Sequence, residues 1–239
     1  MIDLSAYRKP ALHFSGGKDS LACLYLLRDH LQDITVYWLN TGDPCPETLN
    51  VITSARQWIP NFIEVNSDAK AWRLQNGDPS DIVPSCAHTL GVAYGMSERR
   101  LVSKFDCCYF NLMLPMHQRM LEDGVDAVIR GTKLCDTGAV PHEGPTGDYD
   151  VILPIRDWSH QDVFSYLRSV NAPVNPLYEY SHGASAPECL SCTAWWDDGK
   201  AAYLRAKHPE QHGVYMASLC SIRALLSGHL ADLDKELRS

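Results

Sequence analysis

Ser15-Gly16-Gly17-Lys18-Asp19-Ser20 joins a short apolar run, residues 11–14, to a helical pattern at about residues 19–30. The run predicts a buried strand, and the leucines Leu24, Leu27 and Leu31 recur at the spacing of a helix. Glycines let the backbone approach an anion closely, and the first N–H groups of a helix attract negative charge. The stretch therefore predicts a phosphate-binding loop. It is not a Walker loop, which has four residues between its first glycine and Gly-Lys.

Strands and helices continue to alternate after this loop. Ser159 can cap a helix that has Asp162 in its first turn. This alternation is typical of parallel βαβ units. We therefore expect an α/β fold with a Rossmann-like, open, twisted and mostly parallel sheet flanked by helices. The predicted strands are residues 34–39, 62–65, 127–129 and 149–155, and the predicted helices are about 47–58 and 159–169.

The remaining segments differ from this pattern. Residues from about 76 to 95 and from 138 to 147 are rich in turn formers, and we expect irregular loops there. The sequence pattern after residue 196 predicts helix. Its apolar residues at helical spacing are expected to pack in the core or on a partner helix. They are Leu219, Ile222, Leu226, Leu230 and Leu233.

Size and composition limit the functions that are open to this chain. Its 239 residues, 45% of them hydrophobic, suit one sizeable domain over residues 1–239. The net charge of −8 provides no general attraction for nucleic acid, which would need a local basic patch or a partner subunit. No uninterrupted apolar run approaches 18 residues, so we expect no membrane span. The first residues lack the pattern of an export signal, which predicts a cytoplasmic protein.

Nine cysteines in a reducing compartment favour ligands or nucleophiles over disulfides. Cys107-Cys108 and Cys189-x-x-Cys192 together indicate a metal site, although Cys-x-x-Cys alone is shared by zinc sites, redox pairs and clusters. Two further cysteines, Cys23 and Cys220, lie in helical patterns and are expected to be buried. The others, Cys45, Cys86 and Cys135, fall in predicted loops, where Cys86 or Cys135 could carry sulfur.

The loop at residues 15–20 matches the pyrophosphate loop of the ATP pyrophosphatases. Further motifs resemble the 3′-phosphoadenylylsulfate (PAPS) reductase family within that superfamily, whose fold is the adenine nucleotide α-hydrolase type. The resemblance covers about residues 10–196, which leaves 197–239 as a helical extension. These motifs are Asn40-Thr41-Gly42 with Pro46-Glu47-Thr48, Gly131-Thr132-Lys133, residues 153–159, and Asn175-Pro176-Leu177.

The resemblance implies a site for ATP and Mg²⁺. Lys18, Asp19 and Lys133 would be catalytic, with Lys133 where the family usually has arginine. Adenine and ribose would lie near residues 39–42, although Asp43 and Glu47 could equally be a solvated turn and a helix start. The residues implied to bind the nucleotide are Ser15, Gly16, Gly17, Lys18, Asp19, Ser20, Asn40, Thr41, Gly42 and Gly131.

The cysteine pattern closely resembles the [4Fe–4S] site of adenylylsulfate (APS) reductases. A cubane cluster takes one thiolate on each of four irons, so Cys107, Cys108, Cys189 and Cys192 would satisfy it. Zinc is the alternative metal. Adjacent cysteines are unusual in structural zinc sites, which mostly use spaced pairs.

Two features depart from the reductases. Their C-terminal Glu-Cys-Gly-x-His tail is missing from residues 232–239, and the phosphate loop has the intact form that cleaves ATP. The resemblance therefore favours an ATP pyrophosphatase that adenylates an acceptor for sulfur transfer, as in DNA phosphorothioation, with a cysteine desulfurase as a possible sulfur donor. A reductase of sulfate assimilation and a non-catalytic nucleotide and cluster sensor are the alternatives. A homodimer is compatible with this sequence.

Overall fold

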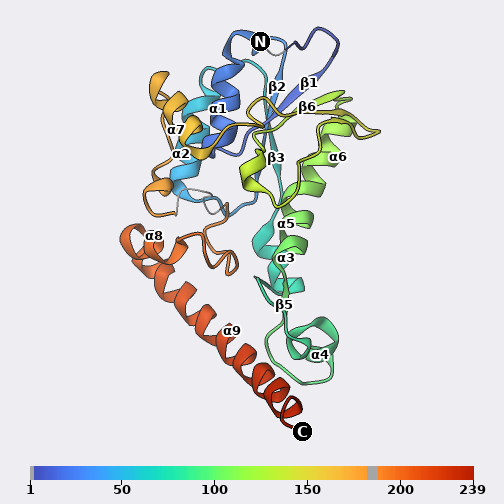
Figure 1. Ribbon diagram of the computed structural model, residues 1–239, viewed down its shortest axis with the longest axis vertical. Helices are drawn as coiled ribbons and strands as arrows, with labels where there is room; N and C mark the ends of the chain where they lie inside the picture. The colour runs from blue at the N-terminus through green and yellow to red at the C-terminus, as the bar shows by residue number, and fades with distance from the viewer. Residues whose placement is uncertain (1–2, 182–187) are drawn as a thin grey trace.

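The computed structural model describes residues 3–181 and 188–239, and its centre is a six-stranded sheet (Figure 1). The strand order is β3-β2-β1-β6-β8-β7, and every neighbouring pair is parallel except β7 with β8. This confirms the open, mostly parallel sheet. The strands are β1 (Pro10–His13), β2 (Thr35–Asn40), β3 (Phe62–Asn66), β6 (Ala127–Ile129), β7 (Gly144–Pro145) and β8 (Asp150–Ile152).

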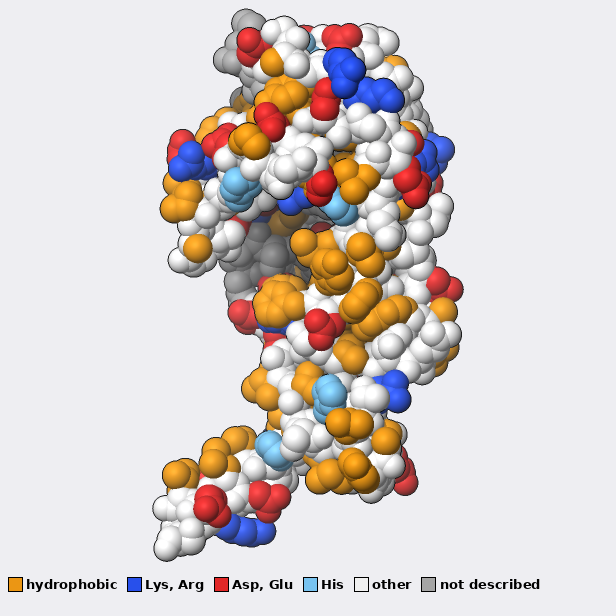
Figure 2. Space-filling view, turned by 90° about the vertical axis from the view of Figure 1, so that its right-hand side faces the viewer, with side chains coloured by type: hydrophobic (Ala, Val, Ile, Leu, Met, Phe, Trp, Pro, Cys, Tyr) orange, Lys and Arg blue, Asp and Glu red, His pale blue; other side chains and the backbone are white. Residues whose placement is uncertain are grey.

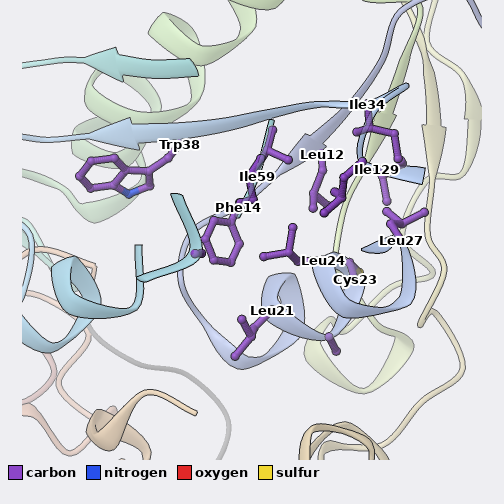
Figure 3. Close-up of a cluster of buried hydrophobic side chains, with 14 of the residues drawn as sticks. Leu12, Phe14, Leu21, Cys23, Leu24, Leu27, Ile34, Trp38, Ile59 and Ile129 are labelled. Carbon is purple, nitrogen blue, oxygen red and sulfur yellow. The ribbon is translucent and has the colours of Figure 1, made fainter. Parts of the chain in front are cut away.

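Helices cover both faces of the sheet. On one face, Leu12 of β1 packs with Leu24 of α1 (Lys18–Leu26) and with buried residues of α2 (Pro46–Arg56) and α7 (His160–Ser169) (Figure 3). On the other face, Ala11 packs with Met120 of α6 (Leu114–Glu122). Adjacent strand residues point to opposite faces, so β1 contributes to both cores.

Most predicted elements are present with shifted ends. The predicted capping box is confirmed, because Ser159 Oγ accepts from the Asp162 amide at 3.2 Å and Asp162 Oδ2 accepts from the Ser159 amide at 2.8 Å. The strand predicted over 149–155 ends at Ile152, shortly before Pro154, which has no amide hydrogen for the ladder. Short helical turns connect the larger elements. They are η1 (Arg28–His30), η4 (Leu134–Asp136) and η5 (Pro176–Glu179).

The stretch predicted to be an irregular loop, residues 76–95, instead contains several short elements. Together with the residues that follow, it forms a small lobe around the parallel pair β4 (Asp78–Ser80) and β5 (Leu101–Ser103). These strands are only three residues long, too short for a period-2 pattern to identify. The other elements here are α3 (Ala69–Asn76), η2 (Ser85–Ala87), α4 (Thr89–Ala93), α5 (Lys104–Cys108) and the π-helix η3 (Tyr109–Met113).

The C-terminal segment is helical, as predicted, and consists of α8 (Lys200–Lys207) and α9 (Pro209–Glu236). The apolar stripe is predicted to pack in the core or on a partner helix. Ile222 packs in the core against Ala87 and Leu101, whereas Leu230 and Leu233 are 59% and 53% exposed in the single chain. α9 runs past the small lobe to the chain end (Figure 1).

The burial predicted for two helical cysteines is right for Cys23 and wrong for Cys220, which is exposed on α9. By length and composition alone, α9 is also apolar enough to cross a membrane. Polar residues interrupt the apolar residues of α9, so this helix contains no continuous apolar run of membrane-spanning length. A single helix of this kind is weak evidence for a membrane segment.

Candidate functional site

The phosphate loop and all four predicted metal cysteines line one cavity of about 530 Å³. The loop follows the carboxyl end of β1, where open parallel sheets bind their ligands. Cys107 and Cys108 come from α5, and Cys189 and Cys192 come from the segment before α8. The fold therefore joins the two predicted sites into one.

The loop is a tight turn, as its glycines predict. Gly16 has a φ of +76°, and a Cβ there would lie 3.1 Å from Ile52 Cδ1. Gly17 is the N-cap of α1 and has no side chain to close the helix end. Ser15 and Ser20 instead close the loop, because their hydroxyl oxygens lie 3.1 Å apart and Ser20 Oγ donates to the Gly17 carbonyl at 3.0 Å.

Two fully buried lysines converge on one carboxylate. The Lys18 ammonium lies 2.8 Å from Asp19 Oδ2, and the Lys133 ammonium lies 2.7 Å from Asp19 Oδ1. Lys133 also contacts Asp136 Oδ2 at 2.8 Å. Burial lowers the pKa of Lys133, but the hydrogen bonds that its ammonium donates to Asp136 and Asp19 outweigh burial and raise the pKa, so this lysine is charged at neutral pH.

Gly131 allows the end of β6 to approach the start of α1. A Cβ on Gly131 would lie 2.7 Å from the Asp19 carbonyl carbon and 2.9 Å from the Ser20 amide nitrogen. Real Cβ atoms do not approach backbone this closely, so this position requires glycine. Gly131 therefore helps to place Asp19 between the two lysines.

We expect Gly131→Ala to lower the free energy of unfolding by about 1–3 kcal/mol, because the backbone at Asp19 must move. Gly138→Ala is the matched control, since a Cβ at Gly138 meets no atom within 4 Å and its change should stay within about 0.5 kcal/mol. Urea unfolding of both variants measures the difference. Equal stabilities of the two variants would contradict the close approach.

Sequence reasoning missed Tyr178. Its hydroxyl oxygen accepts a hydrogen bond from the Lys18 amide at 2.9 Å, and the Lys18 ammonium lies 5.2 Å from the centre of its ring. Tyr178 directly follows Asn175-Pro176-Leu177, so the family motif pointed to this segment but not to this side chain. The residue holds the first turn of α1 in place.

A second cavity, of about 650 Å³, adjoins the loop on the side of the sheet ends. Its lining includes His13, Trp38, Leu39 and Gly131. Burial, with the nearby charge of Arg130, lowers the pKa of His13 to about 3, so its imidazole is neutral at pH 7. His13 Nε2 is buried without a hydrogen-bond partner in the described part of the chain.

This shift makes stability depend on pH. Because the unfolded histidine binds a proton below about pH 6.5 and the folded one only near pH 3, stability falls as the pH drops through this range. Uptake of one such proton on unfolding changes the free energy of unfolding by at most about 1.4 kcal/mol per pH unit. We expect His13→Gln to reduce this dependence by about 1 kcal/mol per unit between pH 6 and 4.5, measured by urea unfolding. His229→Gln, an exposed site, should leave the dependence unchanged.

Asn40, Thr41 and Gly42 lie at the end of β2 but line neither of these two cavities. The Asn40 side chain donates to Glu64 Oε1 and accepts from the Gly42 amide. Thr41 Oγ1 lies 3.4 Å from the Cys189 sulfur, from which it accepts a weak hydrogen bond. Their role in nucleotide binding stays a prediction.

Asp43 is not part of a solvated turn, because its side chain is 1% exposed. It accepts from the amide and the hydroxyl of Ser191, which lies between Cys189 and Cys192. It also contacts Arg73 at 3.2 Å and Lys70 at 3.2 Å. Burial alone would raise the pKa of Asp43, but these partners lower it, so this carboxylate is charged and anchors the Cys-x-x-Cys segment.

Two buried basic side chains, Lys200 and Arg73, lie beside the four cysteines. Lys200 donates to the carbonyl oxygens of Cys189 and Cys192 at 2.9 and 2.5 Å. Burial lowers the pKa of Arg73, but Cys189 and Cys107 raise it more, so the guanidinium stays charged. Neither residue was identified from the sequence, since an isolated lysine or arginine in a helical pattern carries no signal for a buried role.

Burial raises the pKa of the thiols themselves, to about 12 at Cys108 and about 11 at Cys189. Neighbouring cysteines add to the rise at Cys108, while Arg73 opposes it at Cys189. Four thiolates here require a further positive charge, such as a bound metal centre would provide.

The spacing of the four sulfurs bears on the choice of metal. Tetrahedral zinc with Zn–S bonds of about 2.3 Å holds its sulfurs about 3.8 Å apart. In the described residues, the only three candidate ligand atoms within 4.8 Å of one another belong to another group, Cys135, Asp136 and His160. No three of the four cysteine sulfurs lie within that distance of one another.

Comparison with known proteins agrees with this fold. The chain is 27% identical to an adenosine 5′-phosphosulfate reductase of Burkholderia cepacia, over 67% of this chain and 60% of that protein. It is 24% identical to a phosphoadenosine 5′-phosphosulfate reductase of Xanthomonas campestris, over 73% of this chain and 68% of that protein. The chain thus spans only about 60% of the first of these relatives.

A solved structure shares the fold. The phosphoadenylyl-sulfate reductase of Candida auris, crystallised as a phosphate complex, superimposes with a TM-score of 0.52 at 17% identity, over 75% of this chain and 80% of that one. The family described as the phosphoadenosine phosphosulfate reductase domain matches residues 9–192. With this match over most of its length, and with the sheet and loop described above, the chain belongs to the phosphoadenosine phosphosulfate reductase domain family.

Proposed function

We propose that this protein is an ATP pyrophosphatase that adenylates an acceptor for sulfur transfer and carries a [4Fe–4S] cluster. The observation that carries the proposal is the single cavity shared by the phosphate loop and the four cysteines. Two buried lysines meet at the loop, and such a pair can stabilise the charge that develops on transferring phosphates.

The reaction would break ATP between its α and β phosphates. An acceptor oxygen attacks the α phosphorus, the bond to the bridging oxygen breaks, and pyrophosphate leaves with the electron pair. Loop amides and the N-terminus of α1 would bind the β and γ phosphates. Lys18 and Lys133 would stabilise the leaving pyrophosphate, and Asp19 holds both ammonium groups in position. Mg²⁺ would be bound by oxygen atoms from the phosphates and from Asp19.

The four cysteines suit a cluster, because they line one cavity and supply one thiolate for each of four irons. When bound, the cluster would supply electron-transfer chemistry next to the activated acceptor, since all four of its irons would be held by cysteine thiolates. Lys200 and Arg73 would balance the negative charge of the thiolates, and Asp43 would fix the segment that holds Cys189 and Cys192.

The acceptor we propose is nucleic acid, as in DNA phosphorothioation, with a cysteine desulfurase and a reductant supplying the sulfur. The net charge of −8 means that a partner subunit would provide most of the nucleic-acid binding.

Pyrophosphate release from ATP by anaerobically purified protein tests the proposal. We expect release that depends on Mg²⁺ and increases with a nucleic-acid acceptor and a desulfurase. We also expect about four irons per chain, as one cubane cluster contains. If the protein binds ATP but releases no pyrophosphate, even with Mg²⁺, acceptor and desulfurase all present, the proposal is contradicted. That result would favour a nucleotide and cluster sensor.

A second candidate function is that of an APS or PAPS reductase, which the names of the relatives and the exposure of Cys220 favour. The relatives named above are reductases, and Cys220 is exposed on α9, so its thiol is accessible for attack on sulfur. The test is sulfite release from APS or PAPS with thioredoxin. Turnover that is lost in Cys220→Ser would establish the reductase and identify the nucleophile, whereas no sulfite would exclude this candidate.

A further inference from the structure

A group of three different metal-ligand types lies outside the four-cysteine site. Cys135 and Asp136 belong to η4, and His160 is the first residue of α7. The sulfur, one carboxylate oxygen and one ring nitrogen lie within 4.8 Å of one another. Asp136 Oδ1 is 3.9 Å from the Cys135 sulfur and 3.8 Å from His160 Nε2.

The carboxylate is already oriented for a ligand. Asp136 Oδ2 accepts hydrogen bonds from the Lys133 amide and ammonium, at 3.1 and 2.8 Å. The other oxygen, Oδ1, faces the thiol and the imidazole. Hydrogen bonds of this kind to the outer oxygen fix the orientation of metal-binding carboxylates. His160 Nδ1 is buried and has no hydrogen-bond partner within the described ranges, and Nε2 is the ring nitrogen that faces Asp136.

We propose that Cys135, Asp136 and His160 bind a divalent zinc-like ion. A thiolate and an imidazole select zinc or a similar transition metal, whereas Mg²⁺ prefers oxygen ligands alone. In a tetrahedral zinc site, ligand atoms lie about 3.3–3.5 Å apart. The observed 3.8 and 3.9 Å need a contraction of only about half an ångström, which side-chain rotation of Cys135 and His160 can provide.

The ion would keep one open coordination position. Three protein ligands leave the fourth to an exogenous group, as in catalytic rather than structural zinc sites. All three residues line the cavity of the phosphate loop, so an ion here would border that cavity. A phosphate oxygen or a sulfur ligand in the cavity is the chemistry that such a position accepts.

The charged groups beside the site are paired with one another. The ammonium groups of Lys18 and Lys133 are matched by the carboxylates of Asp19 and Asp136, with which they form ion pairs. The thiolate of Cys135 would then offset part of the charge of the metal. Metal binding here needs neither the cluster nor ATP cleavage, so its test does not depend on the proposed function, although Asp136 also contacts Lys133.

Metal content of anaerobic, cluster-loaded protein tests the site. After incubation with Zn²⁺ and desalting, we expect wild type to retain one more zinc per chain than Cys135→Ser and His160→Ala. Cys220→Ser and His229→Ala, at exposed positions of α9, are the matched controls and should retain it. Iron content should be the same in all five proteins, which separates this site from the four cysteines.

Cobalt substitution adds a spectroscopic signature. The spectrum of Co²⁺-loaded wild type minus that of Co²⁺-loaded Cys135→Ser should contain a thiolate-to-cobalt charge-transfer band in the near ultraviolet. Equal zinc contents in wild type, Cys135→Ser and His160→Ala would overturn the proposal. A zinc difference without the charge-transfer band would overturn Cys135 as a ligand.

Discussion

Replacing Lys18 or Lys133 with methionine is expected to lower the rate of pyrophosphate release by about 10²–10³-fold, the typical cost of removing one preorganised group that stabilises transition-state charge. Both side chains are fully buried and both contact Asp19, so the fold fixes the positions of their ammonium groups. Methionine keeps most of the apolar volume of the side chain and removes the charge together with its N–H donors. The readout is anaerobic pyrophosphate release at saturating ATP.

Lys235→Met is the matched control, because this side chain is 78% exposed at the end of α9 and should leave the rate unchanged. Lys133→Arg is a further comparison. It keeps the positive charge that Lys133→Met removes, and it introduces the arginine that the family usually has at this position. Retained activity in both buried methionine variants, with the fold intact by circular dichroism, would show that the lysine pair does not act on the phosphates.

Asp43→Asn is expected to lower the free energy of unfolding by about 3–5 kcal/mol and to release most of the iron. The substitution keeps the shape of the side chain but leaves the buried guanidinium of Arg73 without its carboxylate partner. It also weakens the hydrogen bonds that fix Ser191 between Cys189 and Cys192. Iron analysis and urea unfolding under anaerobic conditions measure the two effects.

The control for Asp43 is Asp29→Asn, an exposed carboxylate whose change should stay within about 0.5 kcal/mol. The charge of the chain changes equally in both variants, so general electrostatics cannot account for a difference between them. An Asp43→Asn protein with normal iron content and stability would show that the turn after β2 does not hold the cysteine segment.

Much of the fold could be predicted from local patterns. The apolar run of β1, the glycines of the loop and the capping box of α7 each act within a few residues, so their sequence is sufficient to identify them. The small lobe was not predicted, because β4 and β5 are three residues long and pair only with each other. The exposure of Cys220 was not predicted either, since helical periodicity alone does not say which part of α9 has a neighbour.

The sequence by itself determined the loop at residues 15–20 and the two cysteine pairs, because glycine conformation, helix starts and ligand spacing are properties of adjacent residues. Only the tertiary structure decided that these features share one cavity, that Asp43 is a buried anchor, and that Lys18 and Lys133 meet at Asp19. The physical reason is that parallel strands bring their carboxyl ends to one edge of the sheet. Burial there depends on neighbours that lie more than a hundred residues away, as between Asp43 and Ser191.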